Sequence, residues 1–282
     1  MKFCVLLPLS ALLVFAGSSE MEKARTLYQE TSYPAALEVL NRFPQKDAAA
    51  YELMGRCHYM QGDFKRATEM FQKAIEREPG DAVHHLWLGR AYGRRAEIAS
   101  VFTAPSMASK ARQSFEKAVQ LDPRNLEAIS DLLEYYLEAP GILGGGVDKA
   151  ARLAEQIEPL DKGEYHWAQA RISEKRKEFD AAEQQLRRAV DMAPNQVGRV
   201  IDLAKFLAKL GRYQESDQAF SQAEKISPDS PKVLFAQAKT YVESGRNLPK
   251  ARELLKRYLQ CRLTPDDPPR AEAERLLRKV AA

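Results

Sequence analysis

The sequence predicts an all-α fold built from a short helix pair that repeats along the chain. Two observations support this prediction. The composition favours helix, because Ala, Leu, Glu, Lys and Arg dominate while β-branched residues are sparse. The same kinds of residue also recur at a spacing of 34 positions, which is typical of a repeat architecture. We therefore expect stacked helix pairs in which each pair contacts mainly its neighbours.

The 34-residue spacing separates Gly55 from Gly89 and Gly211 from Gly245. Residues 48–81 carry the pattern most completely, with large residues at the fourth and seventh positions, glycine at the eighth, and a proline that ends the unit. The residues that carry it are Tyr51, Met54, Gly55, Ala67, Phe71, Ala74 and Pro79. This pattern resembles the tetratricopeptide-repeat (TPR) family, whose unit is two antiparallel helices. The resemblance implies a right-handed α-solenoid of TPR helix pairs.

The resemblance covers nearly all of the chain after residue 16 and suggests its division into segments. Residues 17–46 are expected to form a degenerate leading helix pair. Residues 47–264 follow as a TPR solenoid of about six units. Residues 265–282 are expected to form a C-terminal capping helix, whose charged side suits the end of a stack.

Two of the expected units contain additional residues between their helices, ten in the second unit and about five in the third. We expect long turns near 93–110 and 139–148. The first would contain the apolar pair Val101 and Phe102, which we expect to fold back onto the solenoid, with contact to a partner as the alternative. In the third unit Leu133 takes the place of the eighth-position glycine, so the two helices there are expected to cross at a wider separation.

Residues 1–16 resemble a secretory signal peptide. A basic start at Lys2 is followed by an uncharged apolar run from Phe3 to Ala16 and then by small residues. The run is short for a membrane span and Pro8 interrupts it. We expect an exported protein, periplasmic in a Gram-negative bacterium and otherwise secreted, with no membrane span after signal removal.

The charges and the chemically reactive residues argue against several function classes. The chain has 43 basic and 39 acidic side chains, a balance that gives no indication of nucleic-acid binding. None of the four histidines forms a His-x-x-x-His or Glu-x-x-His pair, and no Ser or Cys stands in a recognisable nucleophile turn. We therefore expect no catalytic residue, no metal site, no cofactor and no enzymatic activity.

The resemblance implies that the first helix of each pair lines a concave groove and presents its fifth and ninth positions there. The ninth position is cationic in five of the six units, and the fifth is largely apolar in the second half of the chain. The candidate partner-binding residues are Arg56, Arg90, Arg171, Lys205, Lys239, Trp167 and Phe235.

The principal hypothesis is an exported scaffold or adaptor that binds a peptide or protein segment with acidic and apolar side chains in this groove. One alternative is an accessory protein that handles a small-molecule solute in an enclosed cavity. Another is a structural array that associates with itself. It is also open whether the basic side chains are ordinary solvated positions that pair with neighbouring glutamates.

Overall fold

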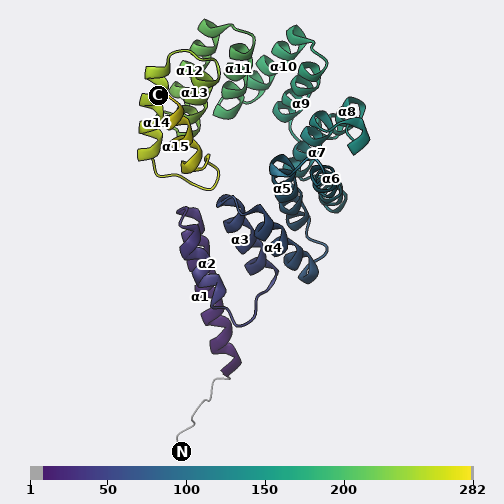
Figure 1. Ribbon diagram of the computed structural model, residues 1–282. Helices are drawn as coiled ribbons and strands as arrows, with labels where there is room; N and C mark the ends of the chain where they lie inside the picture. Colours follow the sequence, from purple (N-terminus) through teal and green to yellow (C-terminus); the bar gives the residue numbers. More distant parts are fainter. Residues whose placement is uncertain (1–8, 281–282) are drawn as a thin grey trace, which may run out of the picture. The chain divides into compact units, whose positions relative to one another are not determined.

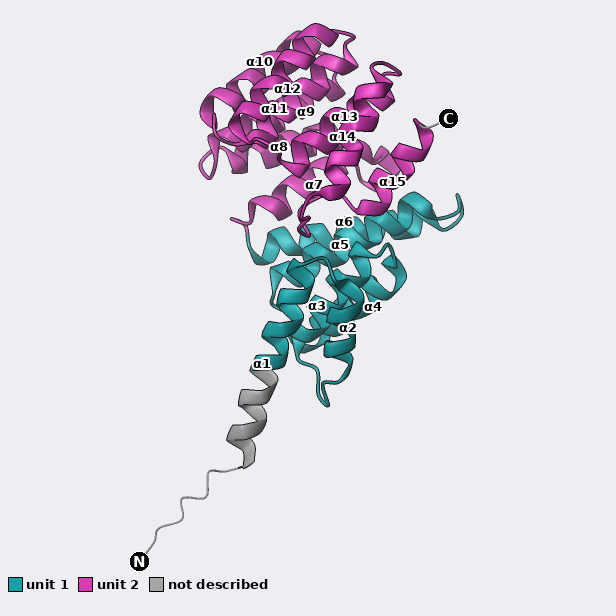
Figure 2. Ribbon diagram, turned by 90° about the vertical axis from the view of Figure 1, so that its left-hand side faces the viewer, with its two compact units in different colours: residues 1–122 teal, residues 123–282 magenta. Residues whose placement is uncertain are grey.

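The structure is a computed structural model that describes the backbone of residues 9–280 and the side chains of residues 19–280. Within that range it contains fifteen α-helices, one short 3-10 helix and no strand (Figure 1). The prediction of an all-α solenoid is confirmed. The chain forms two compact units, coloured separately in Figure 2, of which unit 1 ends at Asp122 and unit 2 begins at Pro123.

Unit 1 contains six helices, in which successive helices pack against each other as antiparallel pairs. They are α1 (Leu9–Gln29), α2 (Tyr33–Asn41), α3 (Ala48–Met60), α4 (Phe64–Arg77), α5 (Ala82–Ile98) and α6 (Ala104–Leu121).

Unit 2 contains nine α-helices, and its last helix packs against both α13 and α14. They are α7 (Leu126–Glu138), α8 (Val147–Ile157), α9 (Lys162–Lys175), α10 (Phe179–Met192), α11 (Val197–Lys209), α12 (Tyr213–Ile226), α13 (Pro231–Glu243), α14 (Leu248–Gln260) and α15 (Arg270–Lys279). The 3-10 helix η1 (Gly141–Leu143) lies between α7 and α8.

Side-chain caps fix the starts of five helices. In each case a carboxylate or amide oxygen accepts a hydrogen bond from a backbone N–H of the first turn, at donor–acceptor distances of 2.7–3.1 Å. These N–H groups have no partner inside the helix, so the cap stabilises the helix start. The capping residues are Asp47, Asp63, Asp81, Asn125 and Asp161.

The eighth-position glycines of unit 1 lie against aromatic rings of the second helix of their pair. A Cβ atom added to Gly55 would lie 2.6 Å from the ring of Phe71, and one added to Gly89 would lie 2.6 Å from the ring of Phe115. Both rings are buried. Each glycine therefore provides the space that an aromatic ring of the second helix fills.

We expect Gly89→Ala to lower the free energy of unfolding of unit 1 by about 1–3 kcal/mol, because the added methyl group overlaps the Phe115 ring. Gly93→Ala, in the same helix, is the matched control. No atom lies within 4 Å of the position of its added Cβ, so the better helix propensity of alanine should leave the protein unchanged or more stable by up to about 1 kcal/mol. Chemical denaturation measures both, and equal losses of stability in the two variants would contradict the close approach.

The first expected long turn, near 93–110, is largely helical, and this prediction was wrong. The additional residues lengthen α5 and α6, so that only residues 99–103 connect them. A connection of five residues is too short to fold back over the helices. Val101 and Phe102 are consequently exposed, at 81% and 91%, where we expected them to pack onto the solenoid.

The second expected long turn lies between α7 and α8 and has an ordered set of hydrogen bonds. The hydroxyl of Tyr135 donates to the carbonyl of Leu143 at 2.9 Å, and Nζ of Lys149 donates to the carbonyl of Gly144 at 2.8 Å. The N–H of Gly146 donates to the carbonyl of Tyr136 at 2.8 Å. These bonds satisfy the backbone of the turn within unit 2.

The predicted signal peptide, residues 1–16, lies outside the residues whose side chains the structure describes, and export stays a prediction. Among the described helices, none combines the length and the apolar character that a membrane span requires.

Candidate functional site

Three cavities lie beside the first helices of successive pairs in unit 2, one lined mainly by α9 and α11 and two lined mainly by α11 and α13. Their volumes are about 280, 620 and 520 Å³. They are lined mainly by α9, α11 and α13, and Lys205 of α11 lines all three. We call these three cavities together the unit 2 groove.

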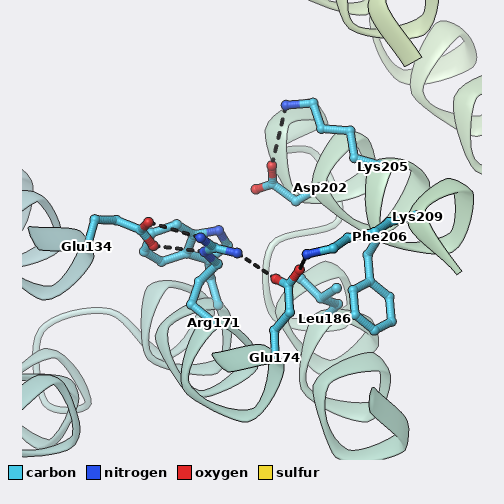
Figure 3. Close-up of a pocket in the computed structure, with 9 residues that line it drawn as sticks. Glu134, Arg171, Glu174, Leu186, Asp202, Lys205, Phe206 and Lys209 are labelled. Atoms are coloured by element: carbon cyan, nitrogen blue, oxygen red, sulfur yellow. Dashed lines mark hydrogen bonds and ion pairs between the residues drawn. The ribbon is translucent and has the colours of Figure 1, made fainter. Parts of the chain in front are cut away.

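The first cavity is bordered by a chain of charged side chains that runs from α7 to α11 (Figure 3). The guanidinium of Arg171 donates to both carboxylate oxygens of Glu134, at 2.8 and 3.0 Å, and to Glu174 at 2.5 Å. Nζ of Lys209 donates to the other oxygen of Glu174 at 2.5 Å. The hydrogen bonds to Glu134 are the main cause that raises the pKa of Arg171. Arg171 is thus permanently charged, but its charge is largely neutralised by these partners.

Lys205 is less fully paired than Arg171. Its side chain is 51% exposed, and its Nζ lies 3.9 Å from Asp202, which is beyond hydrogen-bond distance. Burial raises the pKa of Asp202, although Lys205, Arg199 and Arg171 act in the opposite direction. Because no hydrogen bond holds it to Asp202, the exposed ammonium group of Lys205 is accessible to a bound anion.

The second cavity has the strongest excess of basic side chains. Lys205, Lys209 and Lys239 face a single acid, Glu243. Hydroxyl groups also line it, from Tyr213, Thr240 and Ser244. The third cavity has a more even balance of basic and acidic side chains. Nζ of Lys239 donates to Glu272 of α15 at 3.2 Å, and three aspartates line the same cavity.

Trp167 is the main aromatic side chain in the first cavity. It is half-buried and packs against the core formed by α9 to α13. The guanidinium of Arg199 lies 5.8 Å from its ring centroid, within the range of a cation–π contact, and pairs with Glu164. One part of the Trp167 ring is thus fixed by the core while the rest borders the cavity.

Comparison with known families assigns the chain. The tetratricopeptide-repeat profiles match residues 48–81 and residues 201–268, and the second match contains most of α11 and all of α13. The chain is a tetratricopeptide-repeat protein.

Solved structures agree with this assignment at the level of the fold. A TPR protein from Parabacteroides merdae is similar with a TM-score of 0.58 and 14% identity, over 94% of this chain and 98% of that one. A thermophilic TPR protein from Thermus thermophilus has a TM-score of 0.55 and 22% identity, over 67% of this chain and 98% of that one. The human IFIT1 dimer with PPP-AAAA has a TM-score of 0.56 and 19% identity, over 86% of this chain and 54% of that one. A search among curated proteins finds no match.

The TPR repeats support a general role as a protein-interaction scaffold, since proteins with this fold typically bind protein partners and are generally not enzymes. The described part of the chain has two cysteines, Cys57 and Cys261, and both are free thiols. Burial raises the pKa of Cys57 to about 12, so its thiol is not an activated nucleophile.

The structure separates the sequence-predicted residues of this TPR protein into two groups. Arg171, Lys205, Lys239 and Trp167 line the unit 2 groove. Phe235 also borders the third cavity, but only 4% of it is exposed.

Phe235 is buried in the core that α13 forms with the helices after it. Its ring centroid lies 5.2 Å from that of Tyr258 in α14, and the same core includes residues of α15. The side chain therefore contributes mainly to the core.

The other two candidates, Arg56 and Arg90, lie in unit 1 near one aromatic ring. Their guanidinium carbons lie 4.7 and 4.9 Å from the centroid of Trp87. Arg56 also pairs with Glu52 at 2.5 Å. Both cations therefore have partners within unit 1.

Sequence reasoning overlooked the acids of the groove. Glu174 follows Arg171 by three residues and Asp202 precedes Lys205 by three, so both pairs share a helix face and were recognisable. Glu134 occupies the ninth position of its own repeat, where it was the exception to the basic series. It pairs with the ninth-position Arg171 of the next repeat. Pairing of the basic side chains with glutamates, which the sequence left open, is thus present for Arg56, Arg171 and Lys239.

Proposed function

We propose that this TPR protein is a scaffold that binds an extended segment of another protein in the unit 2 groove. Lys205 carries the proposal, because it lines all three cavities and is the least neutralised of the predicted basic residues in unit 2. A segment that crosses α9, α11 and α13 would pass this side chain whichever cavity it entered.

The lining of the groove favours an acidic segment with at least one apolar side chain. Three lysines line the second cavity, and since Lys209 and Lys239 already donate to Glu174 and Glu272, Lys205 is the main cation that it offers to a carboxylate. Trp167, in the first cavity, offers an aromatic surface that is already fixed by the core. Apolar contact there would supply affinity, and the lysines would set the orientation and the association rate.

The proposal places the scaffold outside the cytoplasm. It rests here on the apolar run of residues 3–16 after Lys2, which resembles a signal peptide. Fractionation of the native cells with an antibody against unit 2 tests this part separately, and a chain that stays full-length in the cytoplasm would contradict it.

We expect Lys205→Glu with Lys239→Glu to weaken peptide binding at least 10-fold, which corresponds to about 1.4 kcal/mol or more. The ligand is obtained by selection from a random peptide library on the tag-free protein, and its Kd is then measured by fluorescence anisotropy. The selected peptides should be rich in Asp and Glu and should carry an aromatic or aliphatic residue. Affinity should fall as the salt concentration rises.

The matched control is Lys225→Glu with Lys256→Glu. These lysines are exposed on α12 and α14 and line none of the three cavities, while the change in net charge is the same. We expect the control to bind within about 2-fold of the unmodified protein. If both double variants bound equally weakly, the loss of affinity would come from the change in net charge and not from the groove. If the groove variant bound as tightly as the unmodified protein, the groove would be excluded as the binding site.

A further inference from the structure

A buried histidine in unit 1 has a ring nitrogen without a protein partner. His84 lies in the first turn of α5 and is 2% exposed. Among the described residues, its Nε2 atom makes no hydrogen bond. Buried polar atoms nearly always have a partner, so an unpartnered one indicates a ligand or a functional role.

Two carboxylates face this nitrogen. An oxygen of Glu78 lies 4.0 Å from Nε2 of His84, and an oxygen of Asp81 lies 3.9 Å from it. The three potential ligand atoms all lie within 4.8 Å of one another. The carboxylates are reached by solvent, with exposed fractions of 61% for Glu78 and 38% for Asp81.

The junction between two repeats produces this arrangement. Glu78 ends α4, Pro79 and Gly80 form the turn, and Asp81 caps α5. One oxygen of Asp81 accepts the N–H of Val83 at 2.7 Å, which leaves the other oxygen directed towards His84. The cap therefore fixes Asp81 and positions a free carboxylate oxygen beside the imidazole.

We propose that Glu78, Asp81 and His84 form a binding site for one divalent transition-metal ion of the Zn²⁺ class. One imidazole and two carboxylates match the ligands of such ions and balance their charge. Zn²⁺ binds imidazole nitrogen and carboxylate oxygen at about 2.0–2.2 Å, so two ligand atoms that share one ion are at most about 4.2 Å apart. The separations of 3.9 and 4.0 Å lie within this limit.

The second nitrogen of the same ring also makes no hydrogen bond among the described residues, but it lies beside a carboxylate that could become its partner. Nδ1 of His84 lies 3.2 Å from a carboxylate oxygen of Glu52, on α3. The other oxygen of Glu52 is held by Arg56 at 2.5 Å. A carboxylate at this place orients the imidazole and directs Nε2 to the metal.

Three protein ligands leave a fourth coordination position for water or another donor atom. Glu78 and Asp81 also border an open hollow of about 610 Å³, which gives this position access to solvent. A bound ion would connect the end of α4 to the start of α5, and through Glu52 to α3. Binding should therefore stabilise this part of unit 1.

The test is a titration of the tag-free chain with Zn²⁺ in competition with a chromophoric chelator. We expect one ion per chain and a higher Tm with Zn²⁺. The variant Glu78→Gln with Asp81→Asn should bind at least 10-fold more weakly, although Asn retains the helix cap. The matched control is Glu76→Gln with Asp47→Asn, which changes another helix-capping aspartate and an exposed glutamate of the same unit. It should bind as the unmodified chain does.

Glu52→Gln tests the orienting carboxylate. It should weaken binding by about 10–100-fold, leave one ion per chain, and leave the visible absorption bands of bound Co²⁺ in place. The variant Glu78→Gln with Asp81→Asn tests the site even if variants of the buried His84 fail to fold. Absence of saturable binding of one Zn²⁺, or equal affinity in the ligand and control variants, would overturn the site.

Discussion

Phe71→Ala is expected to lower the free energy of unfolding of unit 1 by about 3–5 kcal/mol. Phe71 is fully buried in α4. Its ring fills the space beside Gly55 and stacks on Trp87 of the next repeat, with centroids 6.0 Å apart. Removal of the ring leaves a cavity that the backbone of α3 fills only by moving.

The two tryptophans make this effect measurable in one unit at a time. Trp87 lies in unit 1 and Trp167 in unit 2, and the chain has no other tryptophan. Urea unfolding of Phe71→Ala in a Trp167→Phe background therefore reports unit 1 through Trp87. The same substitution at Phe102, which is 91% exposed in the same unit, is the control and should cost less than about 0.5 kcal/mol. Similar losses at the two positions would show that Phe71 does not occupy the core.

Leu133→Gly is expected to destabilise unit 2 by about 3–6 kcal/mol, although it restores the residue that the repeat pattern favours. Leu133 stands at the eighth position of its repeat and is fully buried. Loss of a buried leucine side chain costs about 2–5 kcal/mol, and glycine in a helix interior adds about 1 kcal/mol. At Gly55 and Gly89 the same position has no space for a Cβ atom.

The control for the effect of glycine on helix stability is Glu155→Gly in α8. This position is exposed, so the free energy of unfolding should fall by only about 1 kcal/mol. Unfolding is followed through Trp167 in a Trp87→Phe background. If Leu133→Gly retained or increased the stability of unit 2, the prediction that α7 and α8 cross at a wider separation would be wrong. The two helices would then be as close as those of the pairs that have glycine at this position.

The acidic side chains of the groove show what the sequence could not predict. Arg171 is 37 residues from Glu134, and Lys239 is 33 residues from Glu272. Their distances depend on how neighbouring repeats pack, which no pattern inside one helix determines. The site near His84 was overlooked for a similar reason. Sequence reasoning considered Glu-x-x-His pairs and not the Asp81–His84 pair at the same spacing, and Glu78 joins them only through the turn between α4 and α5.

The sequence by itself determined the helical fold, the repeat period and the close approach at Gly55 and Gly89. These follow from local propensity and from a side-chain pattern that recurs along the chain. Tertiary structure alone decided that the ten added residues lengthen α5 and α6, that Phe235 is buried against Tyr258 of α14, and that Arg171 is neutralised while Lys205 stays exposed. Burial and charge pairing arise between repeats, where the neighbours of a side chain come from distant parts of the chain.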